Sequence, residues 1–455
     1  MPPTACSRRS RPSNPFGEWR PRRVGCYNRP GLKKLHVSLV SLIKPAAACA
    51  AILVCAVFAA RAGAQPGLLV GVTADDLHYA QHPAVLQAAI ADLGLDAVRY
   101  TQQWQAGETK LSSSEAAGLA RGVANAKGLR IVLSVYGAAA AAPQTDTQRA
   151  AYCSYVRSIV RRFPQIHDVV IWNESNSSRF WQPQFSNGSA VAPAQYEALL
   201  AACYGELETA RPGMNVIATL APRGNDDPGA NGVTGIAPAD FVRDLGTAYR
   251  ASGRPVKIFD TLGLNAYGLT SAERPWRAHV HSNDLSEGDY PRLLSALSAA
   301  FAGTGQPLPG AGGVSVWYLE DGFQTTIDPG KASLYTGAEN AKALVPPLAA
   351  HADSASPAAT SPAPDQATQL ADAIELAYCQ PGVGAFFNFL LADEPSLAAW
   401  QSGVLWADDT RKPSFSTLAS VVAQVKAGTV DCSTLPGGAA GGADVTVHGL
   451  RAKVG

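Results

Sequence analysis

Short apolar runs alternate with longer stretches of helical pattern from Gln65 to about residue 427. The short runs are almost continuously apolar, which is typical of strands that are buried on both faces of a parallel sheet. Eight strands are predicted in this way: Leu68–Thr73, Ala97–Gln102, Ile131–Tyr136, Val169–Asn173, Val216–Leu220, Thr261–Tyr267, Val314–Glu320 and Ala385–Leu390.

The stretches between these strands carry helix-start signals. Helices are predicted at Ser114–Ala126, Gln148–Arg162, Ala194–Ala210 and Gln366–Cys379. Ser112 and Glu115 offer a capping box, and Pro193 and Pro238 stand at expected first turns. Eight strand–helix units predict an α/β fold, a single (β/α)8 TIM barrel. An open doubly wound sheet is the structural alternative, although no glycine-rich phosphate turn follows the first strand.

The chain is predicted to divide into three segments. Residues 1–64 are expected to be an N-terminal extension with a Sec-type secretory signal peptide, because basic residues precede the apolar run Pro45–Ala60 and small residues end the segment. Lipid attachment at Cys55 is an alternative, although Val54 is not the small residue that such sites require. Residues 65–430 are expected to form the barrel domain, and 431–455 a flexible tail. The protein is therefore predicted to be secreted, with no membrane association once the signal is removed.

Charge is unevenly distributed between the leader and the rest of the chain. Residues 1–64 hold eleven Lys and Arg and one acidic residue, which leaves 26 basic and 35 acidic residues in 65–455, a formal charge of −9. A protein of that sign is a poor candidate for binding nucleic acid or anionic lipid, so neither is expected as a partner. We expect a monomer.

Four of the eight cysteines lie beyond the leader: Cys153, Cys203, Cys379 and Cys432. An even number in an exported chain suggests two disulfides, for which three pairings exist. Cys153–Cys203 and Cys379–Cys432 are favoured, because each pair would join neighbouring outer elements of the barrel. Four buried free thiols are the alternative. No cysteine has a histidine at metal-ligand spacing, so zinc is not expected.

Two glutamates stand at the carboxyl ends of predicted strands. Glu174 closes the fourth strand after Trp172 and Asn173, and Glu320 closes the seventh. In a barrel of this type the carboxyl ends of the strands meet at one mouth, where active sites are built. Cleavage of a sugar acetal requires two carboxyl groups there. One is protonated and donates to the leaving oxygen, and the other is ionised and attacks or stabilises the oxocarbenium-like centre.

At these positions the chain resembles the retaining (β/α)8 glycoside hydrolases of clan A, which include cellulases, mannanases and β-xylosidases. The resemblance covers nearly all of residues 66–427. It implies that Glu174 is the acid/base and Glu320 the nucleophile. It also implies that Arg99 on the second strand keeps the nucleophile ionised and that Tyr267 on the sixth strand hydrogen-bonds it. Asn173 would bond the sugar 2-hydroxyl.

The sequence departs from that pattern at two places. Asn265 stands two residues before Tyr267, where the clan often has histidine. The eighth strand ends in Phe386-Phe387-Asn388-Phe389 instead of the usual tryptophan platform, so Phe387 or Phe389 could offer a stacking face, or Trp400 or Trp406 could reach in from the following loop. Aromatic residues just past strand ends are further candidates for stacking on sugar rings: Trp104, Tyr136, Phe180, Trp181 and Trp276.

Other readings compete with these assignments. Asp321 could replace Glu320 as the functional carboxylate, although strand alternation would point it away from the mouth. His279 with His281, and His78 with His82, have ligand-like spacing, and Asp226-Asp227 with Asn231 could bind calcium, but no metal site is expected. The long connection Thr325–Pro364 is either a lid or loosely packed decoration.

We therefore predict a secreted retaining glycoside hydrolase that cleaves β-linked bonds of a poly- or oligosaccharide by double displacement without a cofactor. Residues 65–430 would be its catalytic domain. A barrel that binds glycans without cutting them is the alternative from another class. An inverting glycosidase, with its carboxyl groups farther apart, is the alternative mechanism.

Overall fold

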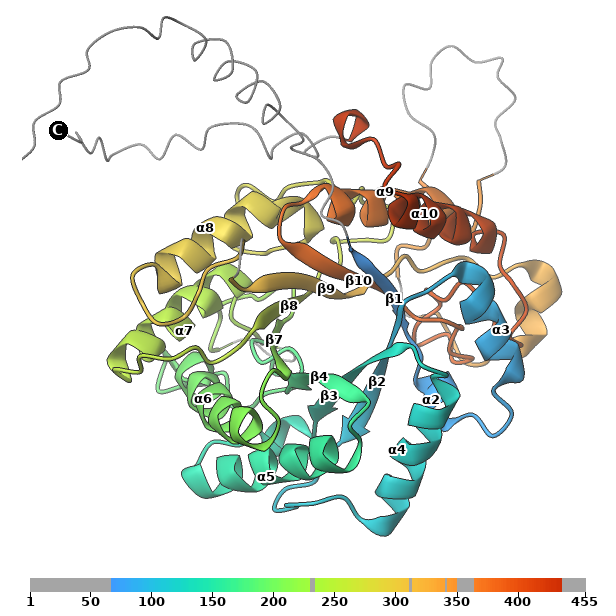
Figure 1. Ribbon diagram of the computed structural model, residues 1–455. Helices are drawn as coiled ribbons and strands as arrows, with labels where there is room; N and C mark the ends of the chain where they lie inside the picture. Colours follow the sequence, from blue (N-terminus) through green and yellow to red (C-terminus); the bar gives the residue numbers. More distant parts are fainter. Residues whose placement is uncertain (1–66, 230–233, 311–312, 340–341, 350–363, 436–455) are drawn as a thin grey trace, which may run out of the picture. The chain divides into compact units, whose positions relative to one another are not determined.

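The computed structural model describes residues 67–229, 234–310, 313–339, 342–349 and 364–435. In this part of the chain eight parallel strands close into a barrel in the order β1-β10-β9-β8-β7-β4-β3-β2 (Figure 1). They are β1 Leu69–Thr73, β2 Ala97–Gln103, β3 Arg130–Tyr136, β4 Ile166–Ile171, β7 Asn215–Leu220, β8 Thr261–Asn265, β9 Ser315–Asp321 and β10 Val383–Phe389. The predicted (β/α)8 barrel is confirmed, and the open-sheet alternative is wrong.

Helices surround the barrel (Figure 1). They are α2 Asp75–Tyr79, α3 Ala84–Leu93, α4 Ser113–Asn125, α5 Asp146–Arg162, α6 Ala192–Ala210, α7 Pro238–Ala251, α8 Tyr290–Phe301, α9 Gln366–Cys379 and α10 Phe415–Ala427. The capping box of Ser112 and Glu115 is present at α4, and Pro193 and Pro238 stand in the first turns of α6 and α7, as predicted. None of the helices in the described ranges is both long and apolar enough to cross a membrane.

Five of the eight strands end at a residue other than the predicted one, and two of them differ by two residues. The fourth and sixth strands were each expected to run two residues farther, but β4 ends at Ile171 and β8 at Asn265. Trp172 has φ +65°, a left-handed conformation that takes the chain out of the extended region. The residues that follow β4 therefore belong to a loop at the barrel mouth.

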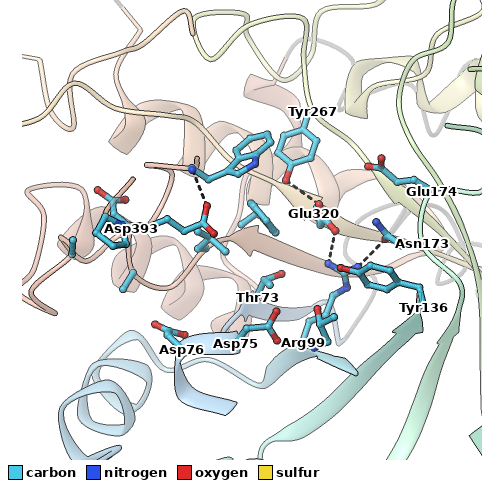
Figure 2. A pocket seen from close by; sticks show the side chains of 18 of the residues that line it. Thr73, Asp75, Asp76, Arg99, Tyr136, Asn173, Glu174, Tyr267, Glu320 and Asp393 are labelled. Carbon is cyan, nitrogen blue, oxygen red and sulfur yellow. Dashed lines mark hydrogen bonds and ion pairs between the residues drawn. The ribbon is translucent and has the colours of Figure 1, made fainter. Parts of the chain in front are cut away.

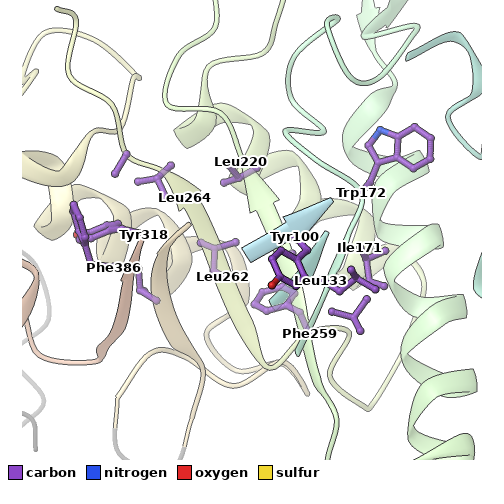
Figure 3. Close-up of a cluster of buried hydrophobic side chains, with 14 of the residues drawn as sticks. Tyr100, Leu133, Ile171, Trp172, Leu220, Phe259, Leu262, Leu264, Tyr318 and Phe386 are labelled. Atoms are coloured by element: carbon purple, nitrogen blue, oxygen red, sulfur yellow. The ribbon is translucent and has the colours of Figure 1, made fainter. Parts of the chain in front are cut away.

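Side chains that point outward from the strands fill the space between the barrel and the helices. Figure 3 shows part of this apolar layer, including Leu262 and Leu264 of β8 and Tyr318 of β9. The residues between them in sequence face the barrel interior, since successive strand residues point to opposite faces. Burial on both faces explains why the strands read as continuous apolar runs.

The barrel interior is closed by an apolar layer beneath the mouth. This layer consists of Leu69, Ala97, Val132, Val170, Ile217, Trp317, Leu319, Ala385 and Phe387. At the amino ends of the strands Arg130 makes two 2.7 Å bonds to Asp168, which also accepts from Asn215 at 2.7 Å. A site built from polar side chains is therefore expected at the carboxyl end of the barrel, above this apolar layer.

The connection after β9 is packed against the loop that follows β10. Thr336 pairs with Ser396 in a β-bridge, and the Lys342 ammonium donates to the carbonyl oxygens of Leu397 and Ala399 at 3.0 and 2.7 Å. The described half of this connection is therefore a structured support for the β10–α10 loop. The Ala-, Ser- and Pro-rich half lies largely outside the described residues, as do the predicted signal peptide and most of the predicted tail.

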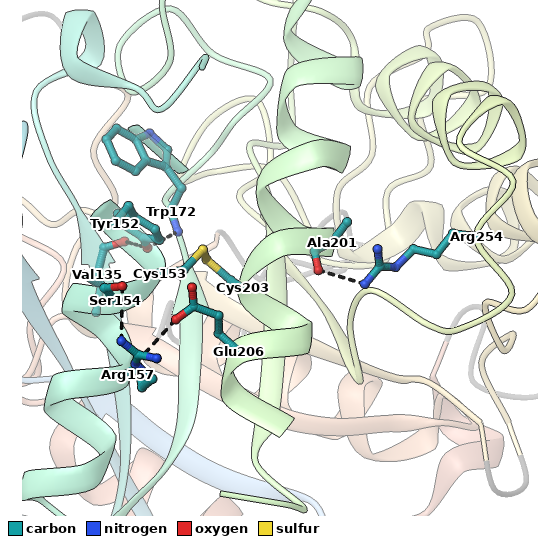
Figure 4. The surroundings of a disulfide bond; sticks show 10 residues. All are labelled: Val135, Tyr152, Cys153, Ser154, Arg157, Trp172, Ala201, Cys203, Glu206 and Arg254. Atoms are coloured by element: carbon teal, nitrogen blue, oxygen red, sulfur yellow. Dashed lines mark hydrogen bonds and ion pairs between the residues drawn. A yellow bond between two sulfur atoms is a disulfide. The ribbon is translucent and has the colours of Figure 1, made fainter. Parts of the chain in front are cut away.

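Two disulfides have the predicted pairing. Cys153–Cys203 joins α5 to α6, and Cys379–Cys432 joins the end of α9 to the short 3₁₀ helix Cys432–Thr434 that follows α10. Figure 4 shows the first bridge next to Tyr152, whose hydroxyl donates to the Val135 carbonyl and accepts from the Trp172 N–H. The bridge thus anchors a helix that holds the loop after β4.

The double substitution Cys153→Ala/Cys203→Ala is expected to lower the free energy of unfolding by about 4 kcal/mol, because the bridge spans 50 residues and restricts the unfolded chain accordingly. The substitution Cys379→Ala/Cys432→Ala should have a similar effect, with a span of 53 residues. Guanidinium denaturation followed by tryptophan fluorescence measures both. Alkylation of Cys153 in the unreduced, denatured protein would contradict the pairing.

Candidate active site

A cavity of about 580 Å³ lies at the carboxyl ends of the barrel strands (Figure 2). Its wall is built from strand ends and from the loops that follow them. The lining residues include Thr73, Asp75, Asp76, Arg99, Thr101, Tyr136, Asn173, Glu174, Arg179, Phe180, Tyr267, Glu320, Phe389, Asp393, Glu394, Trp400 and Asp409. Both predicted glutamates and all three of their predicted supports therefore lie in one cavity.

A β-bulge turns Glu320 into the cavity. Along the β8–β9 ladder Leu264 pairs with Tyr318 and Asn265 with Glu320, so Leu319 is the extra residue. Leu319 belongs to the apolar layer inside the barrel, and strict alternation would have pointed Glu320 outward. Bulges commonly redirect a side chain next to an active site. Asp321, which follows, is buried and accepts from the N–H of Gly322 at 2.7 Å, but it does not line the cavity.

Glu320 is held by a buried arginine and a tyrosine. The Nη1 atom of Arg99 lies 2.5 Å from Glu320 Oε1, and the Tyr267 hydroxyl donates to Oε2 at 3.1 Å. Burial, followed by the charge of Glu320, raises the pKa of Tyr267 well above its ordinary value, so the phenol stays a donor. Both oxygens of Glu320 are thereby oriented while the carboxylate remains at the cavity surface.

Arg99 also connects this carboxylate to the β4 loop. Its Nε donates to Ser134 on β3 at 2.9 Å, and its Nη2 donates to Asn173 Oδ1 at 3.1 Å. Burial alone would lower the pKa of Arg99, but the neighbouring charge of Glu320 and its hydrogen bond raise it overall. One guanidinium thus fixes Glu320 and Asn173 relative to each other.

Glu174 lies in a strained loop that is tied to two helices. Trp172 and Glu174 have φ values of +65° and +39°, which residues other than glycine adopt at a cost. Tyr152 of α5 accepts from the Trp172 N–H, and Tyr196 of α6 donates to the Ile171 carbonyl at 2.8 Å. The disulfide that joins these two helices therefore supports the loop that presents Glu174.

The surroundings of Glu174 favour its protonated form. Burial, and after it the negative charge of Glu320, raises the pKa of Glu174 to about 7. The Asn265 amide donates to Glu174 Oε1 at 2.7 Å and opposes this shift, as do the charges of Arg99 and Arg179. Glu174 thus has a neutral hydrogen-bond partner where Glu320 has a guanidinium.

Two predicted aromatic positions do not belong to the cavity. Trp104 and Trp181 are 2% and 0% exposed, and neither lines the cavity. Both pack edge-on against Trp172, and their rings also contact Tyr152 of α5 and Tyr196 of α6, respectively. The expectation that they present stacking faces to sugar is wrong for both, and Trp276 also lies outside the cavity lining. Tyr136 and Phe180 do line the cavity.

Trp400 lines the cavity from the loop that follows β10. Its ring lies 5.1 Å from that of Tyr267 and 5.2 Å from that of Phe389, and all three line the cavity. Phe387 instead fills the barrel interior and Trp406 is buried outside the cavity, so neither offers a stacking face. The cavity thus has an aromatic wall that comes partly from the β10–α10 loop.

Sequence reasoning missed several acidic residues of the cavity. Asp75 and Asp76 follow β1 directly, so the rule that selected Glu174 and Glu320 could have found them. Asp393, Glu394 and Asp409 lie on the β10–α10 loop, which was considered only as a source of an aromatic side chain, Trp400 or Trp406.

His279 and His78, each from one of the two histidine pairs, contact other protein side chains. His279 bonds Asp289 at 2.7 Å and Glu273 at 3.2 Å, and His78 is buried between the rings of Tyr79 and Tyr100. Across the described ranges no group of three or more His, Cys, Asp and Glu side chains is arranged to hold a metal ion. Asp226 bonds the N–H of Ala237 at 2.8 Å and lies outside the cavity lining, and Asn231 lies outside the described residues.

Comparison with known proteins gives structural likenesses alone. No protein-family model and no curated protein matches the sequence. The chain is similar to GH5_18 from Streptomyces cattleya in complex with GlcNAc (15% identity, 80% of this chain and 81% of that chain, TM-score 0.49). It is also similar to a monomeric beta-xylosidase from Caulobacter crescentus CB15 (15%, 79% and 70%, 0.47) and to the GH39 enzyme from Xanthomonas axonopodis pv. citri (14%, 80% and 68%, 0.46). These names describe those proteins and not this chain.

Proposed function

We propose that the protein is an exported retaining glycoside hydrolase that cleaves a β-linked glycosidic bond by double displacement. Glu320 is the nucleophile and Glu174 the acid/base. The proposal rests on the different surroundings of two carboxyl groups in one cavity. Arg99 and Tyr267 donate hydrogen bonds to Glu320, whereas Glu174 accepts from the neutral amide of Asn265 and has a raised pKa.

In the first step a Glu320 oxygen bonds the anomeric carbon as the bond from that carbon to the leaving oxygen breaks. The leaving oxygen takes the electron pair of that bond and the proton of Glu174. Asn173, whose Oδ1 accepts from Arg99, would donate through its amide N–H to the sugar 2-hydroxyl oxygen. That bond would strengthen as the oxocarbenium-like charge develops.

In the second step Glu174 acts as a general base instead of a general acid. Esterification removes the negative charge of Glu320, which is the second-largest cause of the raised pKa of Glu174. The pKa of Glu174 therefore falls in the intermediate, and its carboxylate takes a proton from water. The water oxygen bonds the anomeric carbon as the ester breaks, and this returns both groups to their starting charges.

Export and glycan cleavage are supported by different features. Two disulfides in the barrel domain suit an oxidising compartment. A cavity with carboxylates on its walls and the rings of Tyr267, Phe389 and Trp400 beside them suits a ligand that has both hydroxyl groups and apolar faces. The roles of Glu174 and Glu320 require only side chains of this chain.

Glu320→Gln and Glu174→Gln are each expected to reduce hydrolysis of aryl β-glycosides by about three orders of magnitude, because each removes one half of the acid–nucleophile pair. Asp321→Asn is the matched control: this neighbouring carboxyl lies outside the cavity and should leave at least half of the activity. Initial rates with purified protein measure the effect.

If the wild type and both glutamine variants hydrolyse the glycoside at the same trace rate, the protein would be a barrel that binds glycans without cleaving them. Loss of activity in Asp321→Asn alone would transfer the nucleophile role to that residue. Proton NMR of the first-formed sugar separates the two mechanisms, since an α-anomer from a β-glycoside would show inversion.

The pH dependence follows from Glu174. The first step needs its protonated form, so the rate should fall as pH rises through about 7. Asn265→Ala removes a donor that favours the charged form, and it should move this alkaline limb upward by about half a unit to one unit. Profiles of kcat/KM against pH for the wild type and for Asn265→Ala measure the shift of the alkaline limb. An alkaline limb that stays fixed or moves down in Asn265→Ala would show that another group is the acid.

A further inference from the structure

The cavity is strongly unbalanced in charge. Seven carboxylic acid side chains line it, against the two arginines Arg99 and Arg179. Two of the seven are Glu174 and Glu320. Of the rest, Asp393 is paired with the buried ammonium of Lys412 at 2.8 Å, and Glu394 accepts from the N–H of Trp400 at 2.8 Å. We define the acidic end as Asp75, Asp76 and Asp409, which the proposed reaction does not use.

The acidic end lies on the glycone side of the cavity. The acid/base meets the leaving group, so the sugar that becomes attached to Glu320 must extend away from Glu174. Figure 2 shows Glu320 between Glu174 on one side and Asp76 and Asp393 on the other. The charges that act on Glu174 are those of Glu320, Arg99 and Arg179, whereas Asp76 feels Asp409 and Asp75.

The acidic end has no directly bonded cation in the described part of the chain, although the charge of Arg99 acts on Asp75. Among the residues that the structure describes, none of Asp75, Asp76 and Asp409 forms a salt bridge, and Arg99 is occupied by Glu320 and Asn173. Asp75 accepts from the N–H of Thr101 at 2.7 Å and also from the Thr101 side chain. Withdrawal from water, and then the like charges of Asp409 and Asp75, raise the pKa of Asp76. Groups that donate hydrogen bonds here would relieve this repulsion.

A buried hydroxyl points independently to a polar ligand at this place. Thr73, at the end of β1, lines the cavity beside Asp75 and is 2% exposed (Figure 2). Its Oγ1 has no hydrogen-bond partner among the described residues. A buried hydroxyl without a partner is costly, so a side chain of this kind at a cavity wall is suited to a ligand group that completes its bonding.

We infer that the acidic end and Thr73 form the glycone subsite for a neutral sugar, whose ring hydroxyls donate to the carboxylates, and that they exclude uronic acids. This inference rests on the proposed function. A uronate carboxyl would lie beside three carboxyl groups that no salt bridge neutralises in the described part of the chain, and this opposes its binding. Trp400 and Phe389 offer ring faces to the apolar side of the same sugar.

The test compares aryl β-glycosides of neutral sugars with the aryl β-glucuronide. The best neutral glycoside should have a kcat/KM at least about 100-fold above that of the glucuronide. Asp76→Asn and Asp409→Asn should narrow this ratio by about tenfold each, and Asp76→Lys should narrow it further. Thr73→Val should lower kcat/KM for the neutral glycoside by about tenfold and leave the ratio unchanged.

Asp146→Asn is the control for net charge, because it removes one exposed carboxylate on α5 outside the cavity lining. It should leave the ratio at the wild-type value. A glucuronide cleaved as fast as the neutral glycosides, or a ratio that none of the acidic-end variants changes, would overturn the inference while leaving a working glycosidase. If no aryl glycoside is cleaved at all, the proposed function itself fails, which is a distinct result.

Discussion

The contact between Arg99 and Glu320 orders the mouth of this barrel. Arg99 is fully enclosed, and a buried guanidinium is tolerated only when charge and hydrogen bonds satisfy it. Glu320, Asn173 and Ser134 do so from three other strand ends or loops. Removing any one partner would leave a buried group unpaired. The geometry of the site is thus a consequence of satisfying one arginine, and the closed strand order brings its partners within reach.

That arrangement also sets the difference between the two glutamates. Arg99 stabilises negative charge at Glu320, and the charge so retained then disfavours ionisation of Glu174. Glu174 stands on a loop whose positive φ values persist because Tyr152 and Tyr196 fix its backbone from helices joined by a disulfide. The disulfide between α5 and α6 therefore helps to fix the position of Glu174. The acidic end, Asp75, Asp76 and Asp409, places further carboxyl groups on the side of Glu320 that faces away from Glu174.

Much of the fold was predictable because parallel strands buried on both faces give continuous apolar runs, and because capping residues such as Ser112 stand at fixed offsets. The resemblance to clan A glycoside hydrolases indicated Arg99, Asn173 and Tyr267, and the strand-end rule located Glu174 and Glu320. It failed for Trp104 and Trp181, since a residue just past a strand can turn into the core as easily as into the cavity. The bulge before Glu320 depends on pairing with β8, and the place of Asp409 depends on distant loop contacts, so local sequence could not reveal either. Trp400 was named as one of two candidates from the same loop, and the choice between it and Trp406 needed the structure.

The central claim is that Glu320 forms a covalent bond to the sugar under control of Glu174. Incubation with a 2-deoxy-2-fluoro glycoside that has a good leaving group slows both steps and lets the ester accumulate. Peptide mass spectrometry then locates the added sugar. The account predicts one label per chain, on Glu320, that builds up in the wild type and is absent from Glu320→Gln. A label on Asp321, or no label in an enzyme that cleaves the parent glycoside, would contradict it.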